Sequence, residues 1–406
     1  MRGFADFLSR ADWLDAARVR RIAVVMALTF TFALAADIWL HMRMGVTNAA
    51  GEQLGRDFVN YWAGGHLAAQ GAASRVYDIH GFLAWQRAHT AANAEFKWFS
   101  YPPMTLLFCL PLAGLGFVAG YGAWLVAGTV SNAALLSKTL GWRHAWLAAL
   151  AAPAAYINAI SGQNGAFTAA LVGAGLLLLE ERPLVAGIFL GALCIKPQLA
   201  LLVPVALAAG GYWRAFFSSG VTALALCALS LLLFGEQSWI AFLHNAPLNG
   251  LLLENSTDFW HRMPTIFAAA RLLGTNIAAA WIAQAISALG AAALVALVWR
   301  VQTSLAMRGA TLIFATFLAT PYAWDYDMIW LTFAVAWMAH EAMREGFRSY
   351  EKFMLALTMT LPLLLSPIGK FTGLQIAPLV LWLMLALAVR RALPYLTGAV
   401  SATQPI

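Results

Sequence analysis

Charged residues are scarce in this sequence, and their scarcity excludes an ordinary soluble domain. Only 11% of the 406 residues are Asp, Glu, Lys or Arg, whereas soluble domains carry about 25%. Cysteine is rare as well, and Cys109, Cys194 and Cys227 all lie in apolar runs. Cysteines in such runs behave as small buried hydrophobes, so neither a disulfide framework nor a cysteine metal site is expected.

Several catalytic motifs are also missing. The sequence contains no Walker phosphate-binding loop, no GxGxxG after a strand, no CxxC and no GxSxG. The enzyme classes that depend on these motifs are therefore not indicated. The net charge of +7 does not indicate nucleic-acid binding either, because Lys and Arg of a membrane protein set its orientation.

Apolar residues are abundant instead. Hydrophobic residues make up 62% of the chain, with 17 Trp and 24 Phe, and a spanning helix needs about 20 apolar residues. Segments that cross a bilayer must be helical, because lipid cannot satisfy backbone hydrogen bonds. The candidate spans are residues 22–41, 119–138, 144–161, 164–180, 184–196, 198–212, 216–234, 276–299, 309–323, 326–340, 353–367 and 374–390. The sequence therefore predicts an all-α polytopic membrane protein with about twelve transmembrane helices.

Lys and Arg predict the orientation of these spans. Residues 1–21 carry five Arg among apolar residues and precede an apolar run without a cleavage site, so we expect an amphipathic arm on the cytoplasmic surface. With that arm inside, sixteen of the 25 Lys and Arg are cytoplasmic, in agreement with the positive-inside rule. Lys196, Arg262, Arg271 and Lys370 break the rule because they lie in short outer connections. Both termini, including the tail 392–406, are expected in the cytoplasm, and the protein is expected in the plasma (inner) membrane.

This threading gives one transmembrane domain, 22–391, with a first outer loop at 42–100 and a later outer loop at 235–275. Residues 101–117 are apolar enough to enter the membrane. A full span there would invert every later segment, so we interpret them as a re-entrant or half-buried helix. Ten of the 18 acidic residues lie on the outer side or at its edge, which indicates a site on that face.

Asp57 is the most informative acidic residue, because it lies in the first outer loop close to the bilayer. If the segment is helical, Asn60 and Tyr61 share a face with it. A partly shielded carboxylate there can act as a general base toward a hydroxyl group. The alternative is that Asp57 caps an interfacial helix.

Lys196 follows an apolar run and precedes Pro197. A lysine in that place either meets an anion such as a phosphate or extends to the interface. Gln163 and Asn164 form a polar turn between apolar helices. That turn either binds sugar or phosphate or is only a helix start.

A second polar group follows Thr320 and Pro321, where the sequence reads Trp324-Asp325-Tyr326-Asp327. Aromatic faces and carboxylates suit carbohydrate, and the alternative is capping of the following helix. The loop 236–264 is longer than a connector requires and contains His261 and Arg262. We interpret it as an acceptor-binding segment or a lid.

Several short motifs follow one another along the chain. They are Arg56-Asp57-Phe58, Val76-Tyr77-Asp78, Tyr101-Pro102-Pro103, Gly162-Gln163, Ala186-Gly187, Lys196-Pro197 and Tyr212-Trp213-Arg214-Ala215. In this order, over roughly residues 20–340, the sequence resembles glycosyltransferase family 87. These are GT-C-fold membrane enzymes similar to polyprenol-phosphate-mannose-dependent α-mannosyltransferases.

The resemblance implies transfer of a sugar from a polyprenyl-phosphate-linked donor, with an Asp of the first outer loop as the catalytic residue. That Asp matches Asp57, and Lys196 matches a position near the donor phosphate. Arg56 and Arg262 are further candidates for the phosphate. Asn60, Tyr61, Gln163, Asn164, His261, Trp324, Asp325 and Asp327 are candidates for sugar or acceptor binding. Residues 320–327 lack the histidine typical of the mannosyltransferases, which leaves the donor sugar open between mannose and another hexose or pentose.

The predicted reaction is an inverting transfer to a hydroxyl of a glycan or glycolipid acceptor on the extracytoplasmic face. Neither a cofactor nor a metal is expected, because no nucleotide pyrophosphate has to be neutralised. The expected partners are the lipid-linked donor, the acceptor and the bilayer, with no nucleic acid. The alternatives are a flippase for a lipid-linked saccharide and a non-catalytic assembly subunit.

Overall fold

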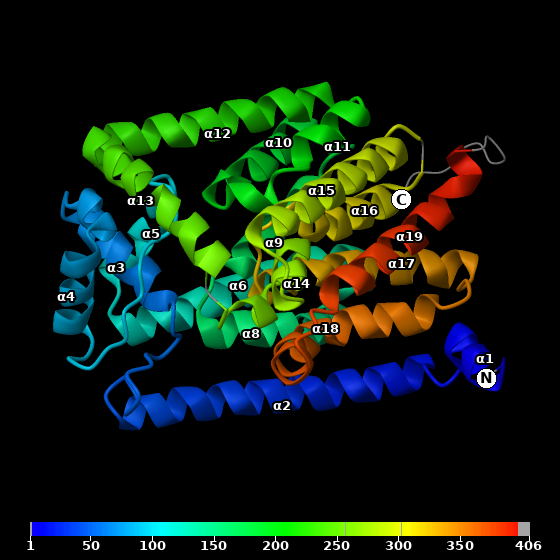
Figure 1. The fold of residues 1–406 in the computed structure, drawn as a ribbon, viewed down its shortest axis with the longest axis horizontal. Helices are drawn as coiled ribbons and strands as arrows, with labels where there is room; N and C mark the ends of the chain where they lie inside the picture. Colours follow the sequence, from blue (N-terminus) through cyan, green and yellow to red (C-terminus); the bar gives the residue numbers. More distant parts are fainter. Residues whose placement is uncertain (1, 256, 302, 397–406) are drawn as a thin grey trace.

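The computed structural model describes residues 2–255, 257–301 and 303–396, and these residues form an all-α protein (Figure 1). The α-helices are α1 (Arg2–Arg10), α2 (Ala16–Arg43), α3 (Phe58–Ala69), α4 (Ile79–His89), α5 (Thr105–Cys109), α6 (Phe117–Leu140), α7 (Trp142–Ala151), α8 (Pro153–Ser161), α9 (Gly165–Leu177), α10 (Pro183–Gly191), α11 (Val203–Ala209), α12 (Trp213–Phe234), α13 (Glu236–Asn255), α14 (Ile266–Leu272), α15 (Ile277–Trp299), α16 (Leu305–Ala319), α17 (Trp330–Glu345), α18 (Glu351–Thr372) and α19 (Ala377–Leu396). The 3₁₀ helices are η1 (Ala73–Tyr77), η2 (Leu110–Gly114), η3 (Ala192–Ile195), η4 (Pro197–Leu199), η5 (Trp260–Arg262) and η6 (Asp325–Ile329).

Five of the described helices are long and apolar enough to cross a membrane: α2, α12, α15, α18 and the described part of α19. Shorter apolar helices, among them α9 and α16, accompany them, so this is a multi-pass membrane protein. Each of the twelve predicted spans contains helix, but four are not single helices. Residues 184–196, 198–212 and 326–340 each combine a 3₁₀ helix with an α-helix, and residues 144–161 are divided into α7 and α8 at Ala152. The division coincides with Pro153 at the first position of α8, where proline is well tolerated.

Several helix ends differ from the limits of the predicted spans. Residues 309–323 were predicted as one span, but α16 begins at Leu305 and ends at Ala319, before Pro321. Helix α2 begins at Ala16, within the predicted arm 1–21, and Asp15 caps it by accepting from the Arg18 N–H at 2.7 Å. Where the chain leaves the cytoplasmic surface stays a prediction. Residues 397–406 of the predicted tail lie outside the described residues, while 392–396 belong to α19.

The bundle has two ends formed by different helices (Figure 1). Helices α3, α4 and α13 lie at one end, which we call the loop end. Helix α1 lies at the opposite end, the arm end, where the Tyr350 N–H donates to Ser9 O at 2.8 Å. Ion pairs of Arg308 with Glu180 (2.9 Å) and of Arg391 with Glu351 (2.6 Å) hold the helix connections of the arm end.

The first loop forms a compact layer of its own at the loop end. A buried cluster that includes Phe58, Tyr61, Trp62, Phe82 and Leu106 joins α3, α4 and α5. Residues 101–117 are not one continuous helix, because they contain only the short α5 and η2, which pack against α3. The re-entrant placement of this segment stays a prediction.

Glycines allow α10 and α12 to pack closely. A Cβ on Gly187 would lie 2.6 Å from Ala215 O, and one on Gly191 would lie 2.3 Å from Ser219 O. Small residues spaced four apart are the usual device for close contact between membrane helices. The α10–α12 contact therefore depends on these two glycines.

Gly191→Ala should lower the free energy of unfolding by about 1–3 kcal/mol, because the new methyl group overlaps a backbone carbonyl. Gly220→Ala in α12 is the matched control, since a Cβ there meets nothing within 4 Å, and it should be neutral or stabilising by up to about 1 kcal/mol. Unfolding in mixed micelles measures both. Equal stability of the two variants would contradict this account of the packing.

Candidate functional site

Asp57 lies on a sharp turn at the loop end. Gly55 (φ +67°) and Arg56 (φ +39°) both have left-handed backbone conformations, and the Asp57 N–H donates to Ser161 O at 3.1 Å. Asp57 occupies the N-cap position of α3, but its side chain makes no capping hydrogen bond. The helix-cap alternative for Asp57 was therefore wrong, and its carboxylate is directed elsewhere.

Gln163 holds the Asp57 carboxylate. Its Nε2 donates to Asp57 Oδ2 at 2.7 Å, and its Oε1 lies 2.7 Å from the Tyr61 hydroxyl and 2.9 Å from the Tyr101 hydroxyl. The two hydroxyls are 2.6 Å apart. A hydroxyl donates one proton, so at least one of the two protons must go to Oε1. The tyrosines therefore fix the amide so that its nitrogen faces Asp57.

Gly162 makes this contact possible. It ends α8 in a left-handed conformation (φ +59°), and a Cβ there would lie 2.2 Å from Gly55 O. No other residue allows the α8–α9 turn to approach the Asp57 turn so closely. The same turn places Asn164 beside Gln163 without a side-chain cap on α9.

Lys196 and Asp327 form a buried ion pair next to this turn. Lys196 Nζ lies 2.5 Å from Asp327 Oδ1, and the two side chains are 2% and 0% exposed. Nζ also donates to Asn164 Oδ1 at 3.3 Å, and Asp327 Oδ2 accepts the Trp324 N–H at 3.1 Å. Asp327 thus caps η6, whereas α17, the helix that it was expected to cap, has no side-chain cap. The ammonium of Lys196 has an anionic partner within the protein.

Arg262 and Asp325 form a second ion pair, which is partly exposed. Arg262 donates from Nε to Asp325 Oδ2 at 2.8 Å and from Nη2 to Oδ1 at 2.9 Å, and its side chain is 32% exposed. Burial alone would lower the pKa of Arg262, but the Asp325 and Asp57 carboxylates raise it above the ordinary value. Asp325 and Asp327 both belong to η6, so this pair lies next to the Lys196–Asp327 pair.

Aromatic side chains surround this pair. Trp324 lies parallel to Tyr326 with ring centroids 5.9 Å apart, and Phe259 and Tyr322 meet its edges at 5.5 and 6.0 Å. Burial raises the pKa of Tyr322 to about 12, and the charges of Asp327 and Asp57 contribute. A Cβ on Gly165 would lie 2.5 Å from Tyr326 O, so the α16–α17 connection packs against the turn that carries Gln163.

Lys97 was not among the residues predicted from the sequence. Its Nζ lies 3.7 Å from Asp57 Oδ1 and 3.0 Å from Glu95 Oε2. Tyr101, which helps to orient Gln163, was not assigned to the site either. Both belong to the irregular segment after α4, where a sequence without helical periodicity gives no signal for a buried or a site-facing position.

Three residues that were predicted to belong to the site, Arg56, Asn60 and His261, contact residues outside it. The Arg56 guanidinium contacts both Asp37 oxygens at 3.2 Å and donates to Ile160 O at 3.0 Å. Arg56 thereby ties the Asp57 turn to α2 and α8. Asn60 Oδ1 accepts from Gln86 Nε2 at 3.2 Å, inside the first-loop layer. His261 packs against Gly369 of α18, and its backbone O accepts from Gln375.

The structure also gives a reason for three of the four cations that broke the charge rule. Lys196 and Arg262 pair with Asp327 and Asp325. Arg271 lies 4.7 Å above the Trp260 ring and donates to Thr275 O at 2.5 Å. Lys370 is exposed. Lys196, Arg262 and Arg271 therefore have partners within the protein, as expected for cations close to a bilayer.

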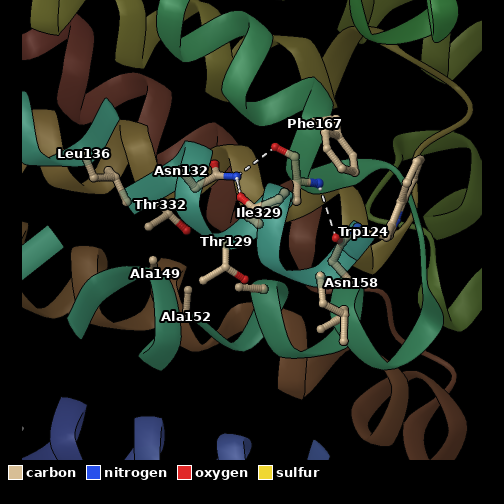
Figure 2. A pocket seen from close by; sticks show the side chains of 15 residues that line it. Trp124, Thr129, Asn132, Leu136, Ala149, Ala152, Asn158, Phe167, Ile329 and Thr332 are labelled. Carbon is tan, nitrogen blue, oxygen red and sulfur yellow. Dashed lines mark hydrogen bonds between the residues drawn. The ribbon is translucent and has the colours of Figure 1, made fainter. Parts of the chain in front are cut away.

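A small cavity lies between α6, α8 and α9 (Figure 2). It encloses about 30 Å³ and is lined by Trp124, Asn132, Asn158 and Phe167 among others, which leaves room for one or two water molecules. Asn132 Nδ2 donates to Ala166 O at 2.8 Å (Figure 2), and Trp124 Nε1 donates to Gln163 O at 3.2 Å. These contacts support the Gln163 turn, and neither Asp57 nor the two ion pairs line the cavity.

A model of glycosyltransferase family 87 matches residues 98–321, more than half of the 406 residues. The chain belongs to glycosyltransferase family 87. The resemblance predicted from the sequence is thereby confirmed, and this family 87 protein is a membrane glycosyltransferase. The matched residues include Gln163, Lys196 and Arg262 but end before Asp325 and begin after Asp57. Comparisons with curated proteins and with solved structures found no match.

Proposed function

We propose that this family 87 protein transfers a sugar from a polyprenyl-phosphate-linked donor to a hydroxyl group of a glycan or glycolipid, with Asp57 as the general base. One observation carries the proposal. Gln163 holds Oδ2 of the Asp57 carboxylate at 2.7 Å, while Oδ1, among the described residues, has only the longer contact with Lys97 Nζ at 3.7 Å and can accept a proton. The side chain of Asp57 is 28% exposed, so a substrate can reach it.

The reaction breaks one bond to the anomeric carbon and forms another. The acceptor oxygen attacks this carbon in line, the bond to the phosphate oxygen breaks, and Asp57 takes the hydroxyl proton as the polyprenyl phosphate leaves. Direct displacement inverts the anomeric configuration. A positioned base of this kind contributes about 10²–10⁴-fold in rate.

The remaining site residues support binding. Arg262 presents a partly exposed guanidinium, which suits a phosphate, while Trp324 and Tyr322 offer aromatic faces to a sugar. Lys196 stays a candidate for the donor phosphate, although the phosphate would have to compete with Asp327 and Asn164 for its ammonium. Arg56 is proposed to position Asp57, because Asp37 and Ile160 O already engage its guanidinium.

The loop end is proposed to face the extracytoplasmic side of a GT-C-like bundle of twelve spans. Arg-rich connections at the arm end agree with the positive-inside rule, and the arm α1 would lie on the cytoplasmic surface. The lipid-linked donor would then reach Asp57 from the outer leaflet.

The test uses the purified protein in liposomes with undecaprenyl-phosphate-linked mannose, other hexoses and pentoses as donors, and octyl glycosides as acceptors. The expected result is undecaprenyl phosphate and a glycosidic bond of the opposite anomeric configuration. Retention of configuration would contradict direct displacement. Movement of labelled donor across the bilayer without a new bond would favour a flippase.

The orientation of Gln163 can be tested with its two tyrosines. Tyr61→Phe should change kcat by less than about threefold, because Tyr101 still donates to Gln163 Oε1. The double variant Tyr61→Phe, Tyr101→Phe removes both donors, so the amide can rotate and present its oxygen to Asp57. We expect kcat to fall about 10–100-fold through lost positioning. If the loss in the double variant were only the sum of the losses in Tyr61→Phe and Tyr101→Phe, this explanation would be contradicted.

A further inference from the structure

The cations of the loop end differ in how firmly the protein holds them. Lys196 is 2% exposed and lies 2.5 Å from Asp327. Arg262 makes a bidentate contact with Asp325 at 2.8 and 2.9 Å. Each of these cations has a short contact with a buried carboxylate, so each pair is already neutral.

Lys97 is held more loosely. Its contact with Asp57 is 3.7 Å long, and the nearer contact, 3.0 Å, is to Glu95, whose side chain is 51% exposed. An ion pair with an exposed carboxylate is weak, because water screens it. Lys97 can therefore exchange Glu95 for another anion with little loss.

The backbone of Lys97 has a buried partner, whereas its ammonium contacts two carboxylates that are both partly exposed. Gln86, which is fully buried, donates from Nε2 to Lys97 O at 2.8 Å. Burial lowers the pKa of Lys97, but Asp57 and Glu95 outweigh it and raise the pKa above its ordinary value. The ammonium is thus charged at neutral pH and stays beside Asp57.

From this arrangement we infer that Lys97 binds the phosphate of the polyprenyl-phosphate donor, leaving Glu95 when the donor arrives. The inference rests on the proposed function and adds a residue to it. The ligand class is a polyprenyl phosphate ester, recognised through a non-bridging phosphate oxygen.

The position beside Asp57 gives Lys97 a part in the transfer itself. The donor is a phosphodiester with one negative charge, and the departing polyprenyl phosphate gains a second as the bond to the anomeric carbon breaks. Asp57 loses its negative charge in the same step, because it takes the acceptor proton. Lys97 lies next to the carboxylate that loses charge and binds the phosphate that gains it, so the transition state requires little reorganisation of the site.

Binding of undecaprenyl phosphate to the full-length protein in nanodiscs tests the inference, with undecaprenol as the probe that lacks phosphate. Lys97→Met should weaken phosphate binding at least about tenfold, and Lys97→Arg should keep most of it. Glu95→Gln should strengthen it about two- to fivefold, because it removes the competing anion. Undecaprenol should bind all variants alike.

Unchanged binding of undecaprenyl phosphate by Lys97→Met would overturn the inference and leave the role of Asp57 intact. Glu95→Gln keeps the test open even if Lys97→Met fails to fold, since weaker or unchanged binding by Glu95→Gln would also overturn it. Failure of the wild-type protein to bind undecaprenyl phosphate would instead overturn the proposed donor class.

Discussion

Asp57→Asn is expected to slow sugar transfer by about 10²–10⁴-fold, the contribution of a positioned general base. Asparagine has almost the same shape, and its Oδ1 can accept from Gln163 Nε2 in place of the carboxylate. The backbone contact of residue 57 with Ser161 O does not involve the side chain. The variant should therefore fold and bind donor, and lose only the ability to take the acceptor proton.

The measurement is kcat and KM for transfer, together with thermal unfolding to show that the variant is folded. Asp78→Asn is the matched control in the same loop. Asp78 caps α4 by accepting the Gly81 N–H, a role that asparagine fills equally well, so its turnover should match the wild type. Turnover of Asp57→Asn close to the wild-type value would exclude Asp57 as the base.

The sequence predicted the long helices well, because α2, α12 and α15 each leave a continuous apolar signal about as long as the bilayer is thick. It predicted helix ends less well. Helix α16 starts after Ser304, whose side chain caps it by accepting the Met307 N–H. It stops at Ala319, shortly before Pro321. These local signals lie within or beside a longer apolar stretch, so hydropathy alone places the boundary incorrectly.

The sequence could predict that the site residues lie on the same side of the membrane, but not which of them contact one another. Charge placement put Asp57, Gln163, Lys196 and Asp327 on one side of the membrane, and the structure brings them to one end of the bundle. Their pairing depends on packing between segments 106 residues apart for Asp57 and Gln163 and 131 apart for Lys196 and Asp327. One sequence contains no information on such pairs. Lys196 was therefore predicted to face a phosphate, although the protein supplies a carboxylate.

Lys196→Met is expected to lower the free energy of unfolding by about 3–5 kcal/mol, because it leaves the carboxylate of Asp327 buried without its cation. Asp327 is 0% exposed and, among the residues that the structure describes, its carboxylate would keep only the Trp324 N–H as a hydrogen-bond partner.

The double variant Lys196→Met, Asp327→Asn separates stability from chemistry. It removes both charges and keeps an oxygen that accepts the Trp324 N–H, so it should recover most of the stability that Lys196→Met loses. Lys370→Met is the control for an exposed lysine at the loop end and should change stability by less than about 0.5 kcal/mol. Equal losses in the single and the double variant would contradict the ion-pair account. If Lys196 contacts the donor phosphate, transfer must stay slow in the double variant although its stability returns. If transfer returns with stability, the contribution of Lys196 is to hold Asp327 and Asn164 in place beneath the site.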